Sequence, residues 1–410
     1  MSETASDKHI VILGAGHAGG RAAEALRQAG HKGRVTLLGA ENHPPYERPP
    51  LSKELLAGAI AHEKTYLHPE EWYAEQGIDL KLGANAVGID RKARRVALEA
   101  GGDISYDALL LTTGARARRL PLPGGNGKRV FYLRDIADTL ALREKLTEGV
   151  RLAIIGAGFI GLEIAATARK RGVAVTVIEL APTPLARVAA PEIGEFLATL
   201  HRGKGVDLRT GLKVTAIEDT GSEVRVLVEG GEPVVADYVA IGIGAQPNVE
   251  IAQAAGIEVR DGILVDEFGR TNDPAIFAAG DVTRHLNPLL GRHVRLEAWQ
   301  NAQNQGIAVA KAIAGSGAAF AEVPWFWTDQ FEVNLQMAGA PDRWDRVVWR
   351  GEPTEPAFTL FQLLEGKVVA AVTINNMRDM RFARMLIQSG KIVDPAALGD
   401  KAVKLQDLVR

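Results

Sequence analysis

Two segments of the chain repeat one order of apolar and polar positions. In the first, an apolar run at 9–13 leads into glycines, small apolar residues recur at helical spacing over 18–29, and a β-rich run follows at 34–39. This order predicts two parallel strands joined by a right-handed helical crossover. The segment 151–180 repeats it with the strand "RLAIIG", the helix "IGLEIAATARKRG" and the strand "VAVTVIE". The chain therefore contains two Rossmann-type units, which we interpret as two domains.

The pattern changes from residue 324 onward. The segment 358–374 alternates apolar and polar residues around a glycine turn, which predicts antiparallel strands, and 377–389 predicts a helix. Strands followed by a helix in this order indicate a third domain of the α+β class. The expected fold is therefore α/β, with two Rossmann-type dinucleotide-binding domains and a C-terminal α+β domain.

Charge and the length of apolar runs restrict the partners of the chain. The 410 residues carry a net charge of -2, so no overall field attracts them to nucleic acid or to an anionic membrane. No apolar run approaches the roughly 18 residues that span a bilayer, and the N-terminal segment lacks the basic start of a signal peptide. We therefore expect a cytoplasmic protein that binds neither nucleic acid nor membrane.

Gly14, Gly16 and Gly19 have the spacing G-x-G-x-x-G between the first predicted strand and its helix. The first glycine permits a tight turn, the second lets the backbone approach a pyrophosphate, and the third lets helix and strand pack closely. An acidic residue that binds the ribose is expected about 20 residues further on. The sequence there is "LLGAE", so Ala40 provides no ligand and Glu41 is the candidate.

Gly156, Gly158 and Gly161 repeat this spacing in the second unit, whose second strand ends on Glu179. A carboxylate at that position accepts hydrogen bonds from both ribose hydroxyls and repels a 2′-phosphate, so we expect NADH rather than NADPH. Two dinucleotides in one chain indicate that hydride passes from one to the other. The first unit is therefore expected to hold a flavin, FAD.

Four segments carry a more specific resemblance. They are "NHPPYERPPLSKELLAG" (42–58), "GAGFIGLEIAATA" (156–168), "AAGDVTR" (278–284) and "PWFWTDQ" (324–330). In this order they resemble the FAD-dependent NADH:ferredoxin reductases of bacterial oxygenase systems, and the similarity covers essentially the whole chain.

The resemblance implies a glutathione-reductase-like architecture of three domains. A discontinuous FAD-binding domain would comprise 1–115 and 248–323, an inserted NADH-binding domain 116–247, and a C-terminal domain that covers the flavin 324–410. Each boundary is an expectation taken from the family.

The resemblance also implies roles for individual side chains. Lys53 would lie beside the N5 edge of the flavin, and Glu163 would pair with it across the hydride path. A lysine there stabilises negative charge on the flavin, and a buried carboxylate orients that lysine. Trp299 would border the isoalloxazine, and Trp327 would close over it. Further residues that the resemblance assigns to the two dinucleotides are Ala18, Arg48, Pro49, Ala86, Thr113, Gly114, Arg134, Ile160, Arg187, Gly242, Gly244 and Asp281.

The sequence contains no cysteine. Disulfide reductases on this fold need a cysteine pair, and thiol-dependent peroxidases, oxidases and coenzyme A-disulfide reductases need one cysteine, so these classes are excluded. The electrons must leave the chain, and a 2Fe–2S ferredoxin that feeds a monooxygenase or dioxygenase is the expected acceptor. Two alternatives are an NADH oxidase or quinone-type reductase with a small-molecule acceptor, and an NADH-sensing binding protein.

The expected ferredoxin is acidic, so a basic rim near the flavin would steer its approach. A solvated helix face explains each basic residue equally well. The candidates are Arg292, Arg295, Arg378, Arg381, Arg384 and Lys404.

Overall fold

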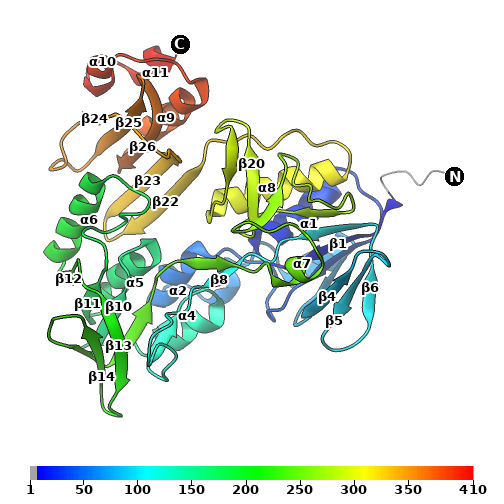
Figure 1. Cartoon of the computed structure of the whole chain (residues 1–410), viewed down its shortest axis with the longest axis horizontal. Helices are drawn as coiled ribbons and strands as arrows, with labels where there is room; N and C mark the ends of the chain where they lie inside the picture. The colour runs from blue at the N-terminus through cyan, green and yellow to red at the C-terminus, as the bar shows by residue number, and fades with distance from the viewer. Residues whose placement is uncertain (1–6, 410) are drawn as a thin grey trace. The chain divides into compact units, whose positions relative to one another are not determined.

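The computed structural model describes residues 7–409 and divides into two compact units (Figure 1). Unit 1 is formed by the described part of Met1–Arg48, by His62–Arg116 and by Ala245–Pro324. Unit 2 is formed by Pro49–Ala61, by Ala117–Gly244 and by the described part of Trp325–Arg410.

Unit 1 contains a five-stranded sheet in the order β19-β7-β1-β2-β3, in which all neighbouring strands are parallel. The strands are β1 (Ile10–Leu13), β2 (Val35–Leu38), β3 (Ile78–Lys81), β7 (Ala108–Leu111) and β19 (Ile276–Ala278). The helix α1 (His17–Gln28) connects β1 to β2. The first strand–helix–strand unit predicted from the sequence is therefore confirmed.

Both faces of this sheet are buried. Ile10 and Ile12 of β1 face a core formed with α1 and α8 (Trp299–Ile313), whereas Val11 and Leu13 face a second core on the opposite side. Side chains alternate between the two faces along a strand, so a strand that is covered on both sides appears as a continuous apolar run. This explains why β1 has no polar position.

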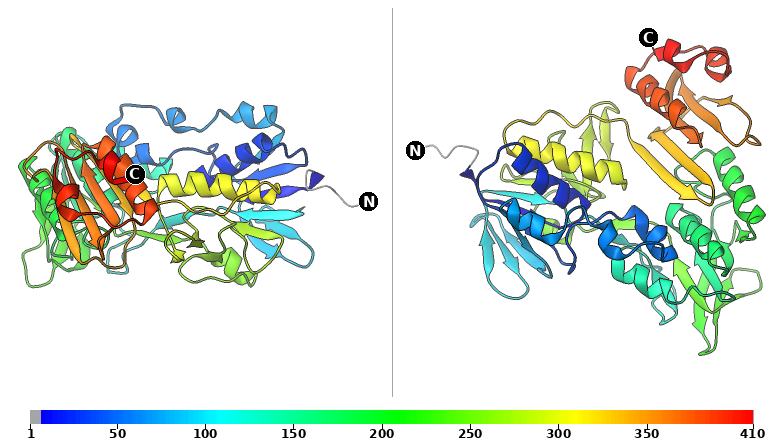
Figure 2. Two further views of the ribbon diagram at one scale, coloured as in Figure 1. Left: turned by 90° about the horizontal axis from the view of Figure 1, so that it is seen from above. Right: turned by 180° about the vertical axis from the view of Figure 1, so that it is seen from behind.

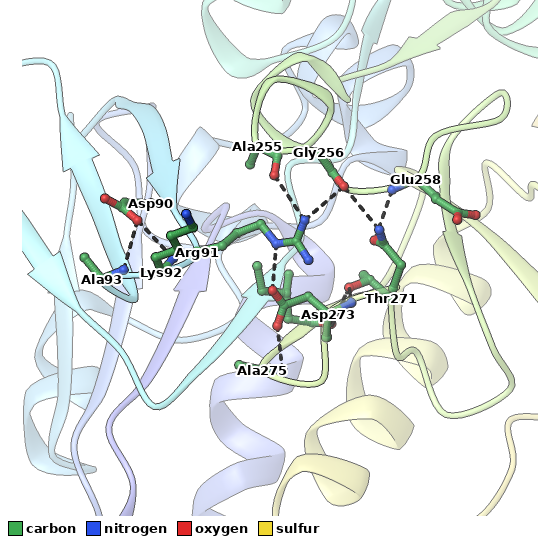
Figure 3. A network of polar contacts seen from close by, with 12 residues as sticks. Asp90, Arg91, Lys92, Ala93, Ala255, Gly256, Glu258, Thr271, Asp273 and Ala275 are labelled. Carbon is green, nitrogen blue, oxygen red and sulfur yellow. Dashed lines mark hydrogen bonds and ion pairs between the residues drawn. The ribbon is translucent and has the colours of Figure 1, made fainter.

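Arg91 joins separate segments of unit 1 (Figure 3). It follows β4 (Ala86–Asp90), and its Nε donates to Asp273 Oδ2 at 2.7 Å while its Nη1 donates to the carbonyl of Gly256 at 3.1 Å. Burial alone would raise the pKa of Asp273, but the hydrogen bond and charge of Arg91 outweigh it and hold that pKa below its usual value. The contacts fix the antiparallel sheet β4-β5-β6 next to α7 (Glu250–Ala254).

The other elements that lie wholly or partly in unit 1 are short. They are η3 (His62–Thr65), α3 (Glu70–Glu75), β5 (Arg95–Leu98), β6 (Asp103–Ser105), β8 (Ala115–Ala117), β17 (Ala245–Pro247), β18 (Ile263–Val265), β20 (Thr283–Asn287) and β21 (Arg292–Val294).

Unit 2 contains a second parallel sheet, in the order β12-β11-β10-β16-β9. Its strands are β9 (Val130–Tyr132), β10 (Arg151–Ile155), β11 (Ala174–Ile178), β12 (Asp207–Arg209) and β16 (Tyr238–Ile241), and α5 (Phe159–Lys170) connects β10 to β11. The second predicted strand–helix–strand unit is thus confirmed. Other elements of this part are η2 (Pro49–Ser52), α2 (Glu54–Ala57), α4 (Ile136–Arg143), α6 (Pro191–Gly203), β13 (Val214–Asp219), β14 (Val224–Val228) and β15 (Val234–Ala236).

The C-terminal part of unit 2 is an antiparallel sheet in the order β22-β23-β26-β25-β24 (Figure 2). Its strands are β22 (Trp325–Gln330), β23 (Val333–Gly339), β24 (Arg346–Arg350), β25 (Phe358–Leu364) and β26 (Lys367–Ile374). The helices are α9 (Met377–Ser389), α10 (Pro395–Gly399) and α11 (Leu405–Val409). The antiparallel pair predicted within 358–374 and the helix predicted over 377–389 are both present. Asn376 caps the start of α9, because its side chain accepts from the backbone N–H of Asp379 at 3.1 Å.

The described chain therefore has the expected fold class. It contains two parallel sheets, each with a glycine-rich strand–helix corner, and an antiparallel sheet with helices. The domain boundaries, and the cofactor of each domain, remain predictions. Across residues 7–409, no helix combines the length and the apolar character needed to cross a membrane.

Candidate functional site

The glycines of the first corner, between β1 and α1, have two different purposes. Gly14 has φ +117°, and a methyl group there would lie 2.2 Å from the carbonyl oxygen of Thr112. A methyl group at Gly19 would lie 2.0 Å from the carbonyl oxygen of Gly14, whereas one at Gly16 would meet no described atom within 4 Å. Packing therefore requires glycine at the first and third positions. The second position faces open space, as the approach of a pyrophosphate requires.

Gly16 is also the N-cap of α1, and within the described residues no side chain caps this helix start. The first N–H groups of a helix lack partners inside the helix and carry partial positive charge, so they bind phosphate groups. His17 adds no charge at neutral pH, because burial lowers its pKa to about 3. The corner thus fits the pyrophosphate of FAD.

Glu41, beyond the end of β2, lies in a polar cluster. Its carboxylate accepts hydrogen bonds from Arg48 Nη2 at 2.8 Å and from the hydroxyl of Tyr46 at 2.5 Å. Burial works to raise the pKa of Glu41, but the charge of Arg48 and the hydrogen bond from Tyr46 hold it below its usual value. Asp281 also interacts electrostatically with Arg48. The structure therefore brings together Glu41, Arg48 and Asp281, three of the residues predicted to contact FAD.

Other predicted FAD residues of unit 1 lie at ordered corners. The hydroxyl of Thr113 donates to the carbonyl of Asn248 at 2.7 Å, and the backbone N–H of Asn248 donates to the carbonyl of Gly114 at 2.9 Å. Trp299 begins α8, and its ring centroid lies 5.2 Å from that of His17. The residue Trp299 is thereby placed next to the first glycine corner.

The remaining predicted FAD residues lie in different surroundings. Ala18 is buried in α1 next to Gly306 of α8. A methyl group added at Gly306 would lie 2.6 Å from the carbonyl oxygen of Ala18. Ala86 begins β4 in unit 1. Arg134 precedes α4 and Pro49 begins η2, so both lie in unit 2. Contact of these residues with FAD stays a prediction.

In the second corner, between β10 and α5, packing again requires the first and third glycines, and the second glycine again has space around it. A methyl group at Gly156 would lie 2.5 Å from the carbonyl oxygen of Gly242, and one at Gly161 would lie 2.0 Å from that of Gly156. At Gly158, the N-cap of α5, the nearest atom would be 3.7 Å away, which is an ordinary contact. Gly158 thus leaves room in front of the helix for phosphate, and Gly242 packs against Gly156 at the same corner, while its contact with a dinucleotide stays a prediction.

Glu179 lies at the tip of this second corner. Its Oε2 accepts from the backbone N–H of Ala157 at 2.6 Å, and its Oε1 accepts from that of Ala181 at 2.8 Å. The two bonds fix the carboxylate beside the glycine loop. This is where a Rossmann-type unit binds the ribose of its dinucleotide.

Three further predicted residues lie around the second corner. The backbone N–H of Leu185 donates to the carbonyl of Ala157 at 3.1 Å, which anchors the loop that carries Arg187. A methyl group at Gly244 would lie 3.4 Å from Arg187 Nη2, so these two predicted residues are neighbours. Ile160, in the first turn of α5, is 41% exposed although it is apolar.

Lys53 and Glu163 form a buried ion pair in unit 2. Lys53 Nζ lies 3.1 Å from Glu163 Oε1, and the two side chains are only 12% and 4% exposed. The hydroxyl of Ser52 donates to Glu163 Oε2, and the hydroxyl of Thr328 donates to Glu163 Oε1 at 2.7 Å. The predicted pairing is therefore present, and both carboxylate oxygens are hydrogen-bonded.

Burial and the polar neighbours of Glu163 have opposite effects on the pKa of its carboxyl group. Burial raises the pKa of Glu163, while the charge of Lys53 and the two hydroxyl donors work to lower it. Lys53 Nζ also lies 5.7 Å from the ring centroid of Trp327 and 3.9 Å from Asp329 Oδ2. A buried carboxyl group whose pKa is raised, as that of Glu163 is, is typical of functional sites.

The cluster contains three further polar residues. Ser52, Thr328 and Asp329 were not predicted, although they lie in the segments "PPLSK" and "PWFWTDQ". Their proximity in sequence to Lys53 and Trp327 was the signal that could have identified them.

The basic residues predicted to dock an acidic partner have different environments. Arg295 forms ion pairs with two carboxylates, so its charge is balanced locally. On α9, Arg378 and Arg381 are exposed, and the guanidinium of Arg384 lies 5.9 Å from the ring centroid of Trp325. Their role in docking stays a prediction.

Comparison with known proteins identifies two family models in the chain. The model for pyridine nucleotide-disulphide oxidoreductases matches residues 8–306, and the model for the reductase C-terminal domain matches residues 325–409. The second match begins where the antiparallel sheet of unit 2 begins.

Several proteins are similar to the chain over nearly its full length. The ferredoxin–NAD(+) reductase component of the anthranilate 1,2-dioxygenase system of Burkholderia cepacia is 44% identical, over 97% of this chain and 98% of that protein. The ferredoxin reductase for the CYP199A2 system of Rhodopseudomonas palustris has a TM-score of 0.94 at 38% identity, over 98% of this chain and all of that one. Putidaredoxin reductase in its covalent complex with putidaredoxin has a TM-score of 0.95 at 38% identity, over 98% of both chains. The chain therefore belongs to the pyridine nucleotide-disulphide oxidoreductase family, in the branch that contains these ferredoxin reductases.

Proposed function

We propose that the chain is an NADH-dependent ferredoxin reductase. It takes an electron pair from NADH and passes single electrons to a 2Fe–2S ferredoxin, which feeds a monooxygenase or dioxygenase. The observation that carries this proposal is the combination of two dinucleotide corners with a complete absence of cysteine. Relatives named as ferredoxin reductase components of oxygenase systems support it along the whole chain.

FAD, when bound, accepts hydride from NADH and releases its electrons one at a time. The N–H groups at the start of α1 would hold its pyrophosphate, and Glu41 would bind its adenosine ribose. Lys53 places a positive charge where negative charge develops during hydride transfer. Glu163 keeps the ammonium group of Lys53 in position, because their contact distance is 3.1 Å and both are largely shielded from water.

The second corner binds NADH in this proposal. The start of α5 holds the pyrophosphate, and Glu179 accepts hydrogen bonds from the ribose hydroxyls, which excludes a 2′-phosphate. Arg187 adds a positive charge for the phosphates. Ile160 offers an exposed apolar surface at the first turn of α5, which is suited to the uncharged, planar ring of the reduced nicotinamide.

The proposed acceptor follows from the absence of a thiol that could take up the electrons. The chain offers no thiol, so the electrons leave to another molecule. A 2Fe–2S ferredoxin accepts one electron at a time, and basic residues would steer an acidic ferredoxin toward the reductase. We place the protein in the cytoplasm, where NADH is available as the donor.

Steady-state reduction of cytochrome c by NADH tests the acceptor. With FAD-loaded protein, the rate should depend on added 2Fe–2S ferredoxin and should saturate with it. Equal rates with a quinone or dioxygen alone would favour a reductase of small molecules. Slow reoxidation by every acceptor would favour an NADH-sensing protein.

A further inference from the structure

One face of α5 meets one face of β22 through matched positions. The ring centroids of Phe159 and Phe326 lie 4.1 Å apart, and one turn further along α5, Glu163 accepts from the hydroxyl of Thr328. Gln330, two residues beyond Thr328, therefore points to the same side of β22. Phe326, Thr328 and Gln330 therefore lie on one side of β22, and the first two contact successive turns of α5.

Gln330 extends the contact to a third element. Its Nε2 donates to Thr328 Oγ1 at 3.2 Å, and its Oε1 lies 2.8 Å from Nε2 of His201, in the last turn of α6. A continuous hydrogen-bonded chain thus runs from His201 through Gln330 and Thr328 to Glu163, and from there to Lys53. Its first four members are each at most 3% exposed.

The atoms of this chain fix the direction of every hydrogen bond. An amide nitrogen only donates, so the hydroxyl of Thr328 accepts from Gln330 and keeps its own hydrogen for Glu163. An amide oxygen only accepts, so His201 must carry its hydrogen on Nε2. Burial lowers the pKa of His201, which keeps the imidazole neutral with Nδ1 unprotonated. All donors therefore point toward the carboxylate of Glu163.

The turn between β22 and β23 is tied to the same helices. Lys170 of α5 donates to the carbonyl of Phe331 at 3.2 Å, and Lys204, after α6, pairs with Glu332 at 2.9 Å. Phe331 has φ +57°, an uncommon conformation for a bulky residue, and its ring packs edge-on against His201 at 5.1 Å. Anchoring of this turn holds Gln330 in register with His201.

Nothing in the proposed function uses Gln330 or His201 directly. We propose that they are positioning residues, which hold the hydroxyl of Thr328 as a donor to Glu163 and so keep that carboxylate charged opposite Lys53. The inference rests on the proposed function for its consequence in hydride transfer, but the hydrogen-bonded chain can be measured without it.

The consequence concerns the protonation of Glu163. The charged or titratable groups that face this series of hydrogen bonds are Lys53, Asp329 and His201. Without a donor at Thr328, the charge of Glu163 would be balanced by Lys53 and the hydroxyl of Ser52 alone. The carboxyl would then take up its proton at a higher pH, and Lys53 would lose its partner in that range.

The test uses four substitutions in the FAD-loaded full chain. Thr328→Val removes the hydroxyl donor, and Thr328→Ser keeps it. Gln330→Leu and His201→Phe interrupt the series of hydrogen bonds further from Glu163. The matched control is Thr373→Val, on β26 of the same sheet, because Thr373 is buried and its hydroxyl has no hydrogen-bond partner among the described residues. Infrared difference spectroscopy follows the carboxyl band of Glu163, assigned by its loss in Glu163→Gln.

We expect Thr328→Val to raise the midpoint of Glu163 protonation by about one pH unit or more, and the two distant substitutions to raise it by a smaller amount in the same direction. Thr328→Ser and Thr373→Val should leave the midpoint as in the unmodified chain. The acid limb of the rate of flavin reduction by NADH should move upward with the infrared midpoint.

A midpoint that moves in Thr328→Val but not in Gln330→Leu and His201→Phe would overturn the inference, and so would an equal shift in Thr373→Val. Nitrogen-15 NMR of the unmodified chain gives a test that needs no folded variant. It should find His201 protonated on Nε2 only. Protonation on Nδ1 would contradict the proposed series of hydrogen bonds. If NADH failed to reduce the flavin while the infrared midpoints moved as expected, the proposed function alone would fail.

Discussion

The carboxylate of Glu163 lies 3.1 Å from the ammonium nitrogen of Lys53, and water reaches little of either group. Isolated charges are unstable in such surroundings, and removal of one partner leaves the other uncompensated. The chain satisfies the carboxylate with two hydroxyls in addition, while the ammonium faces the ring of Trp327. We interpret the pair as an electrostatic device built for hydride transfer, not as a source of stability.

Neutralising Glu163 tests this interpretation. In Glu163→Gln the shape is kept, but Lys53 loses the charge that lies 3.1 Å away and keeps only the longer contact with Asp329, so its ammonium group is held less firmly. We expect the rate of flavin reduction by NADH in stopped flow to fall by about 100-fold, with little change in the apparent affinity for NADH. Glu223→Gln, which weakens a half-buried pair with Arg151, serves as the control and should keep the normal rate.

Two glycines of the first corner should respond differently to the same substitution. Gly14→Ala places a methyl group 2.2 Å from a backbone oxygen at a positive φ, so it should lower the free energy of unfolding by about 1–3 kcal/mol or more. Gly16→Ala has room for the methyl group, and the apoprotein should unfold near the normal temperature. It should instead weaken FAD binding by about tenfold or more, as measured by flavin fluorescence. Equal loss of stability in the two variants would contradict the assignment of Gly16 to the pyrophosphate.

The choice of dinucleotide should depend on Glu179. Glu179→Ala removes the ribose acceptor and the repulsion of a 2′-phosphate, so the KM for NADH should rise by about 10- to 100-fold and the preference over NADPH should shrink. Glu179→Gln keeps a carbonyl acceptor for one backbone N–H, so it separates the loss of charge from loosening of the loop. The ratio of kcat/KM for the two dinucleotides provides the measurement, and an unchanged ratio in both variants would rule out a ribose contact.

Acid should destabilise unit 1 partly through His17. Burial lowers its pKa from 6.5 to about 3, so below pH 6.5 the unfolded chain binds a proton that the folded chain does not. Stability from this residue is therefore present above pH 6.5 and falls as the pH decreases toward 3, by up to about 1.4 kcal/mol per pH unit. His17→Phe keeps a ring next to Trp299 and should show a shallower decrease in Tm with acidification. Parallel curves for the two proteins would exclude this role.

The sequence predicted the parallel cores of both units because their strands are buried on both faces. Such strands are continuous apolar runs, and the helix between them has its own period, so the segments around β1 and β10 were recognisable. The helix α9 was predicted with its observed bounds. In the structure Asn376 caps its start, and Gly390 adopts the left-handed conformation at its end.

The small antiparallel sheets were not predicted. The strands β4, β5 and β6 are short and consist mostly of half-buried and exposed positions: Val96 is the one buried residue among them, and Val87 is 60% exposed. The place of this sheet in unit 1 depends on contacts with distant segments, such as that of Arg91 with Asp273, which local patterns do not contain.

The candidate site shows the same division. The glycine corners and Glu179 followed from spacing, whereas the pairing of Lys53 with Glu163 came from resemblance to a family. Thr328 stands next to Trp327 in a segment that had been singled out, but its hydrogen bond with Glu163 joins two distant parts of the sequence, so this contact could not be predicted from local patterns.

Anaerobic titration of the FAD-loaded protein with NADH tests the central claim most directly. A chain without thiols has the flavin as its only store of electrons, so one equivalent of NADH per FAD should complete the bleaching of the flavin absorbance, and two equivalents of oxidised ferredoxin should restore it. Bleaching that needed two equivalents of NADH, or a failure of ferredoxin to restore the absorbance, would contradict the account.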